Sequence, residues 1–150
     1  MQFIHIFSGL LTPIIGITTI FILDLQYSLQ EYKVRHDLYE PRMKVYRAII
    51  KFLEHVNGFG DASQEDISEL IEQTAEAHFL FKGKIEKHIQ SLQNRGIDIQ
   101  GVNMQLRNQL LPIGERRNKL ADALGKHFAW FNAQFEVTTK LFDEYLKLDR

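Results

Sequence analysis

Four basic residues in the last third of the chain are the best candidates for binding chemistry. They are Arg107, Arg116, Arg117 and Lys119, and they lie on either side of a helix break at Pro112–Gly114. Backbone N–H groups at the start of a helix, together with arginine side chains, can hold a phosphate group. The pattern therefore predicts an anion site that would fit a signalling nucleotide, and ordinary surface charge is the competing interpretation.

Sequence motifs for bond-making chemistry are missing. The chain has no phosphate-binding loop G-x-x-x-x-G-K-[ST], no G-x-G-x-x-G, no H-E-x-x-H and no G-x-S-x-G. It has no cysteine, which excludes disulfides and thiolate catalysis. Its six histidines do not form metal-ligand spacing, and no glutamate precedes a histidine by three residues as in di-iron bundles. We therefore expect no enzymatic activity, no catalytic residue, no cofactor and no bound metal.

The balance of charges also limits the choice of partners. The formal net charge is −1, so the chain has no global basic field of the kind that draws a protein onto nucleic acid. We expect no duplex nucleic acid as a partner.

The first stretch of the chain is apolar enough to predict a membrane anchor. Residues 3–23 hold no Asp, Glu, Lys or Arg, and at about 1.5 Å per residue they reach roughly 31 Å, the thickness of a bilayer core. A cleaved signal peptide and a buried soluble helix are the alternatives; the stretch lacks a basic start and a small-residue cleavage site. We expect a transmembrane anchor over 1–24, with the lipid bilayer as a partner.

Basic residues follow this stretch and indicate its orientation. Lys33, Arg35, Arg42 and Lys44 lie on its C-terminal side, and no Lys or Arg precedes it. The positive-inside rule therefore predicts a single-pass protein of the inner membrane with its domain in the cytoplasm.

Small and polar residues form one stripe inside the apolar stretch. Ser8, Thr12 and Gly16 are spaced four apart and share one helix face. Small residues let helices approach closely, so the stripe predicts self-association, and a small pore is a further option. The competing interpretation is that such residues are common in single spans that do not associate.

A heptad pattern follows and predicts a stalk. Such a seam is typical of helices that pair, and it supports a homo-oligomer. We expect residues 25–57 to form a stalk and the first helix of a bundle, either kinked or restarted at Pro41. The seam residues are Leu25, Leu29, Tyr32, His36, Tyr39, Met43, Tyr46, Ile50 and Leu53.

The residues after the stalk indicate a turn and a second helix. Gly58 suits the left-handed position after a helix end. Ser63, with Asp66 three residues later, is a capping-box pattern that starts a helix. We expect Asn94-Arg95-Gly96 to close that helix and residues 97–103 to form a connector.

The C-terminal part predicts a short helix over 104–111 and a long final helix over 115–148. Each buried Phe stabilises a fold by roughly 1.5–3 kcal/mol, so the aromatic ladder on the final helix is expected to be core. A ligand groove and a nucleic-acid stacking platform are the alternatives. Residues 58–150 would then complete an all-α fold, in which one transmembrane helix continues into an antiparallel helical bundle of three long helices. The ladder includes Leu124, Phe128, Phe131, Phe135, Phe142 and Tyr145.

Several short patterns occur in order along the charged part of the chain. They are Arg42-x-x-Val45-Tyr46-x-Ala48, Phe79-Leu80-Phe81, Pro112-x-Gly114-Glu115-Arg116-x-Asn118-Lys119-Leu120, Trp130-Phe131-x-x-Gln134-Phe135-Glu136-Val137 and Tyr145-Leu146. As a set they resemble a group of short uncharacterised bacterial proteins with one N-terminal transmembrane helix and a helical cytoplasmic domain. The resemblance implies a membrane location and a helical fold, and it implies no activity and no catalytic residues. Lys82 departs from the group, which has Gly directly after Phe-Leu-Phe.

Two functions follow as expectations. The first is a membrane-anchored, self-associating helical module that acts as a scaffold or sensor at the inner membrane. The alternative is an oligomeric membrane effector, for example in anti-phage defence, gated by a ligand such as a signalling nucleotide. The two differ in whether ligand binding to the cytoplasmic domain disturbs the membrane.

Overall fold

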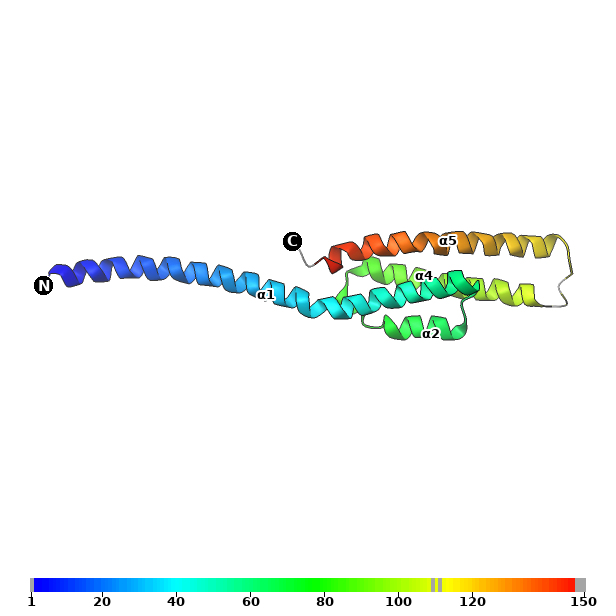
Figure 1. Cartoon of the computed structure of the whole chain (residues 1–150), viewed down its shortest axis with the longest axis horizontal. Coiled ribbons are helices and arrows are strands. Elements are labelled where there is room, and N and C mark those ends of the chain that lie inside the picture. Colours follow the sequence, from blue (N-terminus) through cyan, green and yellow to red (C-terminus); the bar gives the residue numbers. More distant parts are fainter. Residues whose placement is uncertain (1, 109, 111, 148–150) are drawn as a thin grey trace. The chain divides into compact units, whose positions relative to one another are not determined.

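The computed structural model describes residues 2–108, 110 and 112–147, with side chains from Gly16 onward except that of Arg35. Every regular element in this part of the chain is an α-helix, which confirms the predicted all-α class. The helices are α1 (Gln2–Phe59), α2 (Gln64–Gln73), α3 (Ala77–Leu80), α4 (Gly83–Arg107) and α5 (Glu115–Leu146) (Figure 1).

The chain divides into two compact units, residues 1–38 and 39–150. Helix α1 contributes to both, because its helical backbone continues through Pro41 to Phe59. Pro41 has no N–H, so the carbonyl group of Asp37 cannot receive its usual hydrogen bond from four residues later. The helix nevertheless does not restart at Pro41, which removes one of the two predicted alternatives.

The predicted membrane anchor is corrected by the structure. Among the described residues, no helix combines the length and the apolar character needed to cross a membrane. The predicted transmembrane helix over 1–24 is therefore not supported, and the finding contradicts the predicted single-pass location in the inner membrane.

The predicted stripe falls mostly outside the described side chains. Ser8 and Thr12 lie outside the residues whose side chains are described. Gly16 is the first residue of that range. A Cβ atom added at Gly16 would meet no other atom within 4 Å, so Gly16 lies in open space.

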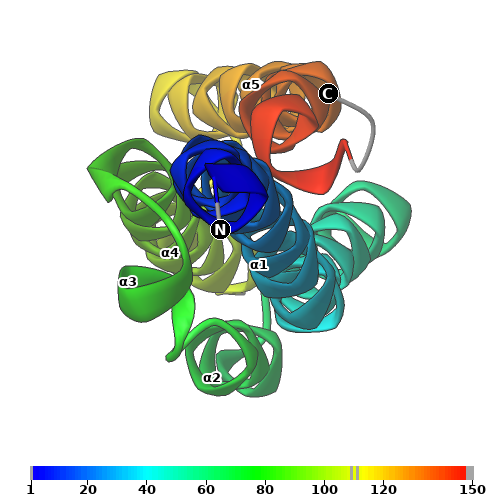
Figure 2. The same cartoon turned by 90° about the vertical axis from the view of Figure 1, so that its left-hand side faces the viewer.

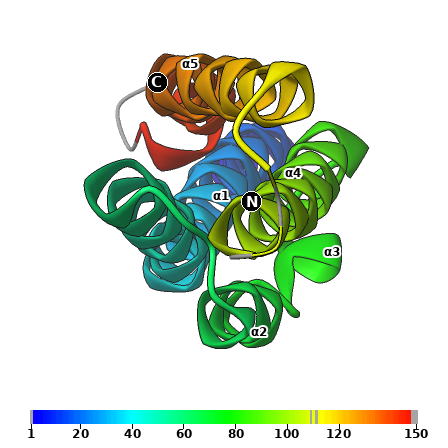
Figure 3. The same ribbon diagram turned by 90° about the vertical axis from the view of Figure 1, so that its right-hand side faces the viewer.

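The second unit is a layered bundle of antiparallel helices. Helices α4 and α5 run antiparallel and contact each other along their length (Figure 1). Seen end-on, α5 and α2 lie on opposite sides of the pair formed by α4 and the C-terminal part of α1 (Figure 2; Figure 3). The core lies between these helices, and short α3 packs against α4.

Helix α1 supplies one wall of this core with a wide buried stripe. The predicted seam residue Leu53 is buried, whereas Tyr46 and Ile50 are only half-buried, so the buried stripe coincides only in part with the predicted seam. The reason is that α1 is covered from more than one side, whereas a seam faces a single partner helix. The buried residues on α1 are Val45, Ile49, Phe52, Leu53 and Val56.

The aromatic ladder of α5 fills the core as predicted. Phe131 and Phe142 are both 0% exposed. The ring of Phe131 meets that of Phe52 at 6.1 Å between centroids, and the ring of Phe142 meets that of Tyr46 at 5.4 Å. These edge and tilted contacts add to the hydrophobic burial that joins α1 to α5.

The prediction of one continuous helix from Ser63 to Gly96 is wrong, because the helical backbone is interrupted between α2 and α4. Helix α2 ends at Gln73, and Phe81 and Lys82 have extended backbones between α3 and α4. The extended Phe81 places its ring 5.0 Å from that of Phe142 and 5.2 Å from that of Tyr145. The free energy gained by burying this aromatic ring in the core outweighs the free energy that a continuous helix would gain.

Gly96 does not close a helix, because α4 continues to Arg107 and includes the predicted connector. A Cβ atom at Gly96 would lie 3.1 Å from the ring of Phe52 and 3.4 Å from Ile67. Gly96 therefore permits the close approach of α4 to α1 and α2.

The turn after α1 confirms one local prediction and corrects another. Ser63 and Asp66 form the predicted capping box at the start of α2. The left-handed residue is Gly60, with a φ of 71°, rather than Gly58, which still belongs to α1. The N–H of Gly60 donates to the carbonyl of Val56 at 3.0 Å and so closes the end of the helix.

Candidate functional site

A groove between the C-terminal part of α1 and α2 is the best candidate for a binding site. Its volume is about 310 Å³, at the lower end of the range for small-molecule sites. Phe52 and Leu70 are buried at its floor, and Ala48 is half-buried beside them. The lining residues are Lys44, Arg47, Ala48, Lys51, Phe52 and His55 from α1, and Asp66, Glu69, Leu70 and Gln73 from α2.

Cations occupy the α1 wall of the groove. Lys44, Arg47 and Lys51 are spaced three and four residues apart, which places them on one face of the helix. The Nζ atom of Lys51 on α1 lies 2.5 Å from Oε1 of Glu69 on α2, so this ion pair joins the two helices that line the groove. Arg47 lies 4.0 Å from Glu40 in a pair that is exposed on both sides and so contributes little stability. Within the described part of the chain, Lys44 has no carboxylate partner.

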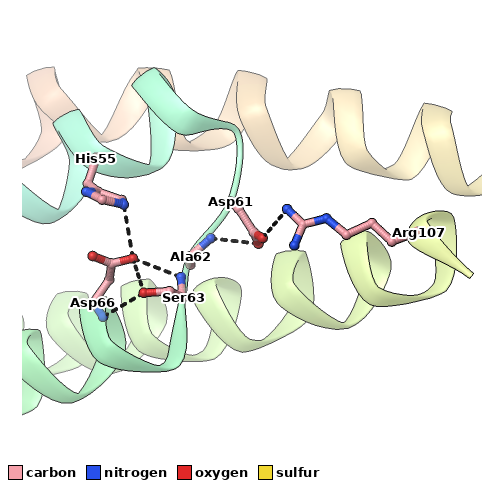
Figure 4. Close-up of polar contacts among 6 residues, drawn as sticks. All are labelled: His55, Asp61, Ala62, Ser63, Asp66 and Arg107. Atoms are coloured by element: carbon pink, nitrogen blue, oxygen red, sulfur yellow. Dashed lines mark hydrogen bonds and ion pairs between the residues drawn. The ribbon is translucent and has the colours of Figure 1, made fainter.

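The other end of the groove carries a carboxylate that is already bound. Oδ2 of Asp66 accepts hydrogen bonds from the N–H of Ser63 at 2.9 Å and from its Oγ at 2.5 Å. Nε2 of His55 lies 3.2 Å from the same oxygen (Figure 4). The ring of His55 also stacks on that of Phe59, with 4.4 Å between centroids. The groove is therefore cationic at the Lys44 end, and at the other end the carboxylate of Asp66 is held by partners from its own chain.

Ser63, His55 and Asp66 are the residue types of a hydrolytic triad, but their contacts are different. In a triad the serine bonds to the histidine, which in turn bonds to the aspartate. Here Ser63 and His55 both contact Oδ2 of Asp66, and Oγ of Ser63 accepts from the N–H of Asp66 at 3.1 Å. The cluster caps α2, and Oγ of Ser63 donates to the carboxylate of Asp66 rather than to His55.

The loop before α2 is fixed to the end of α4. Nη2 of Arg107 lies 2.8 Å from Oδ2 of Asp61, whose other oxygen accepts from the N–H of Ala62 at 2.9 Å (Figure 4). Nδ2 of Asn103 donates to the carbonyl of Gly60 at 2.8 Å. Arg107, predicted as an anion ligand, thus binds a carboxylate of its own chain.

The other predicted anion ligands lie in the first two turns of α5. Arg116 is exposed and Arg117 is half-buried. Lys119 pairs with Glu115, 2.6 Å from its Oε1. Two of the four predicted cations are therefore already paired with carboxylates, and the anion site at this position stays a prediction.

A buried polar pair joins α4 to α5, and it was not predicted from the sequence. Nε2 of His88 lies 2.9 Å from Oγ1 of Thr138, and the two residues are 8% and 0% exposed. Burial lowers the pKa of His88 below its usual value of 6.5. The spacing of His88 from Ile85 and Leu92 places it on the buried face of the helix, so its burial could have been predicted from the sequence. In the described part of the chain, no cluster of His, Asp or Glu is suited to hold a metal ion.

Comparison with known protein families, with curated proteins and with solved structures finds no match to this chain.

Proposed function

We propose that this chain is a non-enzymatic, self-associating helical module. Copies join through the first unit, and each copy carries its second unit as a binding scaffold. The observation that carries the proposal is the apolar surface of α1 in the first unit. Large apolar side chains there are 54% to 70% exposed. They are Ile17, Ile20, Phe21, Ile22, Leu23, Leu25, Tyr27, Leu29, Tyr32 and Val34.

The size of this surface supports association. A large apolar side chain that is more than half exposed leaves roughly 100 Å² in water, so the set presents on the order of 1,000 Å². Monomeric soluble proteins rarely expose a contiguous apolar patch larger than about 300–600 Å².

The heptad spacing supports a second copy of the chain as the partner. Leu25, Leu29 and Tyr32 are core positions of the seam, and all three are exposed. A second copy presents the same spacing on a helix of the same length, so the two seams match without any additional requirement. Tyr27 lies on the opposite face of the helix and serves as the reference position.

The absence of native cysteine makes this pairing testable by cross-linking. We expect Leu29→Cys to form a disulfide-linked dimer under mild oxidation, since seam positions of paired parallel helices bring Cβ atoms close together. The matched variant Tyr27→Cys should cross-link much less, because its position faces away from the partner. Equal cross-linking of the two variants, or none in either, would contradict the proposal.

A further inference from the structure

We propose that the groove between α1 and α2 binds a small organic anion, with a compact apolar body on Phe52 and Leu70 and a carboxylate or phosphate at Lys44 and Arg47. This proposal is independent of self-association, because the groove lies entirely within the second unit.

The floor of the groove favours an apolar body. Phe52 and Leu70 are 4% and 2% exposed and form the base, and Ala48 leaves room between the two helices. A volume of about 310 Å³ fits a group of the size of one or two rings. Since Phe52 and Leu70 are already nearly covered, the apolar surface that a ligand can still remove from water includes that of half-buried Ala48.

The distribution of charge favours an anion over a cation or a neutral ligand. Glu69 is satisfied by Lys51, and Asp66 is satisfied by Ser63 and His55. Both lining carboxylates therefore already have partners within the chain.

Two cations remain at the open end. Lys44 has no carboxylate partner among the described residues, and the exposed pair of Arg47 with Glu40 at 4.0 Å is weak enough to exchange for a ligand. An ammonium and a guanidinium three residues apart on one helix face can both donate to one carboxylate or phosphate.

The test uses the full chain and four probes, three of them aromatic. The first two, 2-naphthoate and 2-naphthyl phosphate, carry both an anion and an apolar body. The other two, 2-naphthalenemethanol and acetate, each lack one of these features. Calorimetry should show saturable binding of one or both naphthyl anions, with the stronger one identifying the preferred head group. The alcohol and acetate should bind at least tenfold more weakly.

Two variants locate the binding. Lys44→Gln combined with Arg47→Gln should weaken binding of the better naphthyl anion by about tenfold or more, since it removes two charge-assisted hydrogen bonds. Ala48→Leu should weaken it by filling the groove. The matched control Lys126→Gln removes an exposed cation from α5 and should leave the affinity unchanged.

Methyl NMR distinguishes the groove from the exposed apolar surface of the first unit. The methyl signals of Leu70 should shift on titration, and those of Leu29 should not. Equal affinity for the alcohol and the anions, full affinity in both groove variants, a shift confined to Leu29, or no saturable binding would each overturn the proposal.

Discussion

Gly96 and Gly101 lie five residues apart in α4 and meet different surroundings. A Cβ atom at Gly96 would press against the buried ring of Phe52 at 3.1 Å, whereas one at Gly101 would meet nothing within 4 Å. The same chemical change at the two positions therefore separates the packing role of a glycine from its effect on the helix backbone.

The two alanine variants should change stability in opposite directions. Gly101→Ala should stabilise the chain by about 0.5–1 kcal/mol, because alanine favours the helix. Gly96→Ala gains the same propensity, but it crowds a packed core at a cost of about 1–3 kcal/mol, so a net loss of about 1 kcal/mol is expected. Urea denaturation followed by circular dichroism measures both. Equal stabilisation by the two substitutions would show that α4 does not pack closely at Gly96.

Single residues were predictable from the sequence where their role is local. The capping box of Ser63 and Asp66 depends only on residues three apart, and it is present as predicted. Gly96 was predicted to end a helix, because a glycine serves a helix end and a close contact equally well. The choice between these roles depends on Phe52 and Ile67, which are distant in sequence.

At the scale of elements, the interface of α4 and α5 contains the His88–Thr138 pair. Burial holds the pKa of His88 below 6.5 in the folded chain. As the pH falls through about 6.5, the unfolded chain takes up a proton at this position before the folded chain does. Stability contributed at neutral pH is therefore lost with acidification.

Replacement of His88 should reduce the stability that the chain loses on acidification. The free energy of unfolding should fall less between pH 7.5 and pH 5.5 in His88→Gln than in the natural chain. The other five histidines are common to both chains, so the difference reports on His88. Urea titrations at the two pH values provide the measurement. An identical pH dependence in both chains would show that His88 is protonated equally in the folded and unfolded states.

Elements were predictable where one periodic pattern covers them. The final helix and its aromatic core follow from spacing alone, and α5 runs from Glu115 to Leu146 with Phe131 and Phe142 buried. The break between α2 and α4 was not predictable in this way, because the helical pattern continues across it. Its cause is the burial of Phe81 against α5, which is a tertiary contact.

At the scale of the whole molecule, the all-α class was predictable from composition and periodicity, but the groove was not. Lys44 and Arg47 resemble ordinary surface charge until α2 packs beside them. That packing depends on the helix break between α2 and α4, which the sequence pattern does not indicate. The predicted membrane location is also contradicted, because no helix of the described residues has the length and the apolar character needed to cross a membrane.

The central claim is that the exposed apolar surface of the first unit joins copies of the chain. Sedimentation equilibrium of the full chain over a range of concentrations tests it most directly. We predict masses that are multiples of 17.6 kDa and a return toward 17.6 kDa in the double variant Leu25→Glu with Leu29→Glu. The control Tyr27→Glu should stay associated, and circular dichroism should show the helices of the second unit intact. A mass of 17.6 kDa at every concentration, or an unchanged assembly in the double variant, would contradict the account.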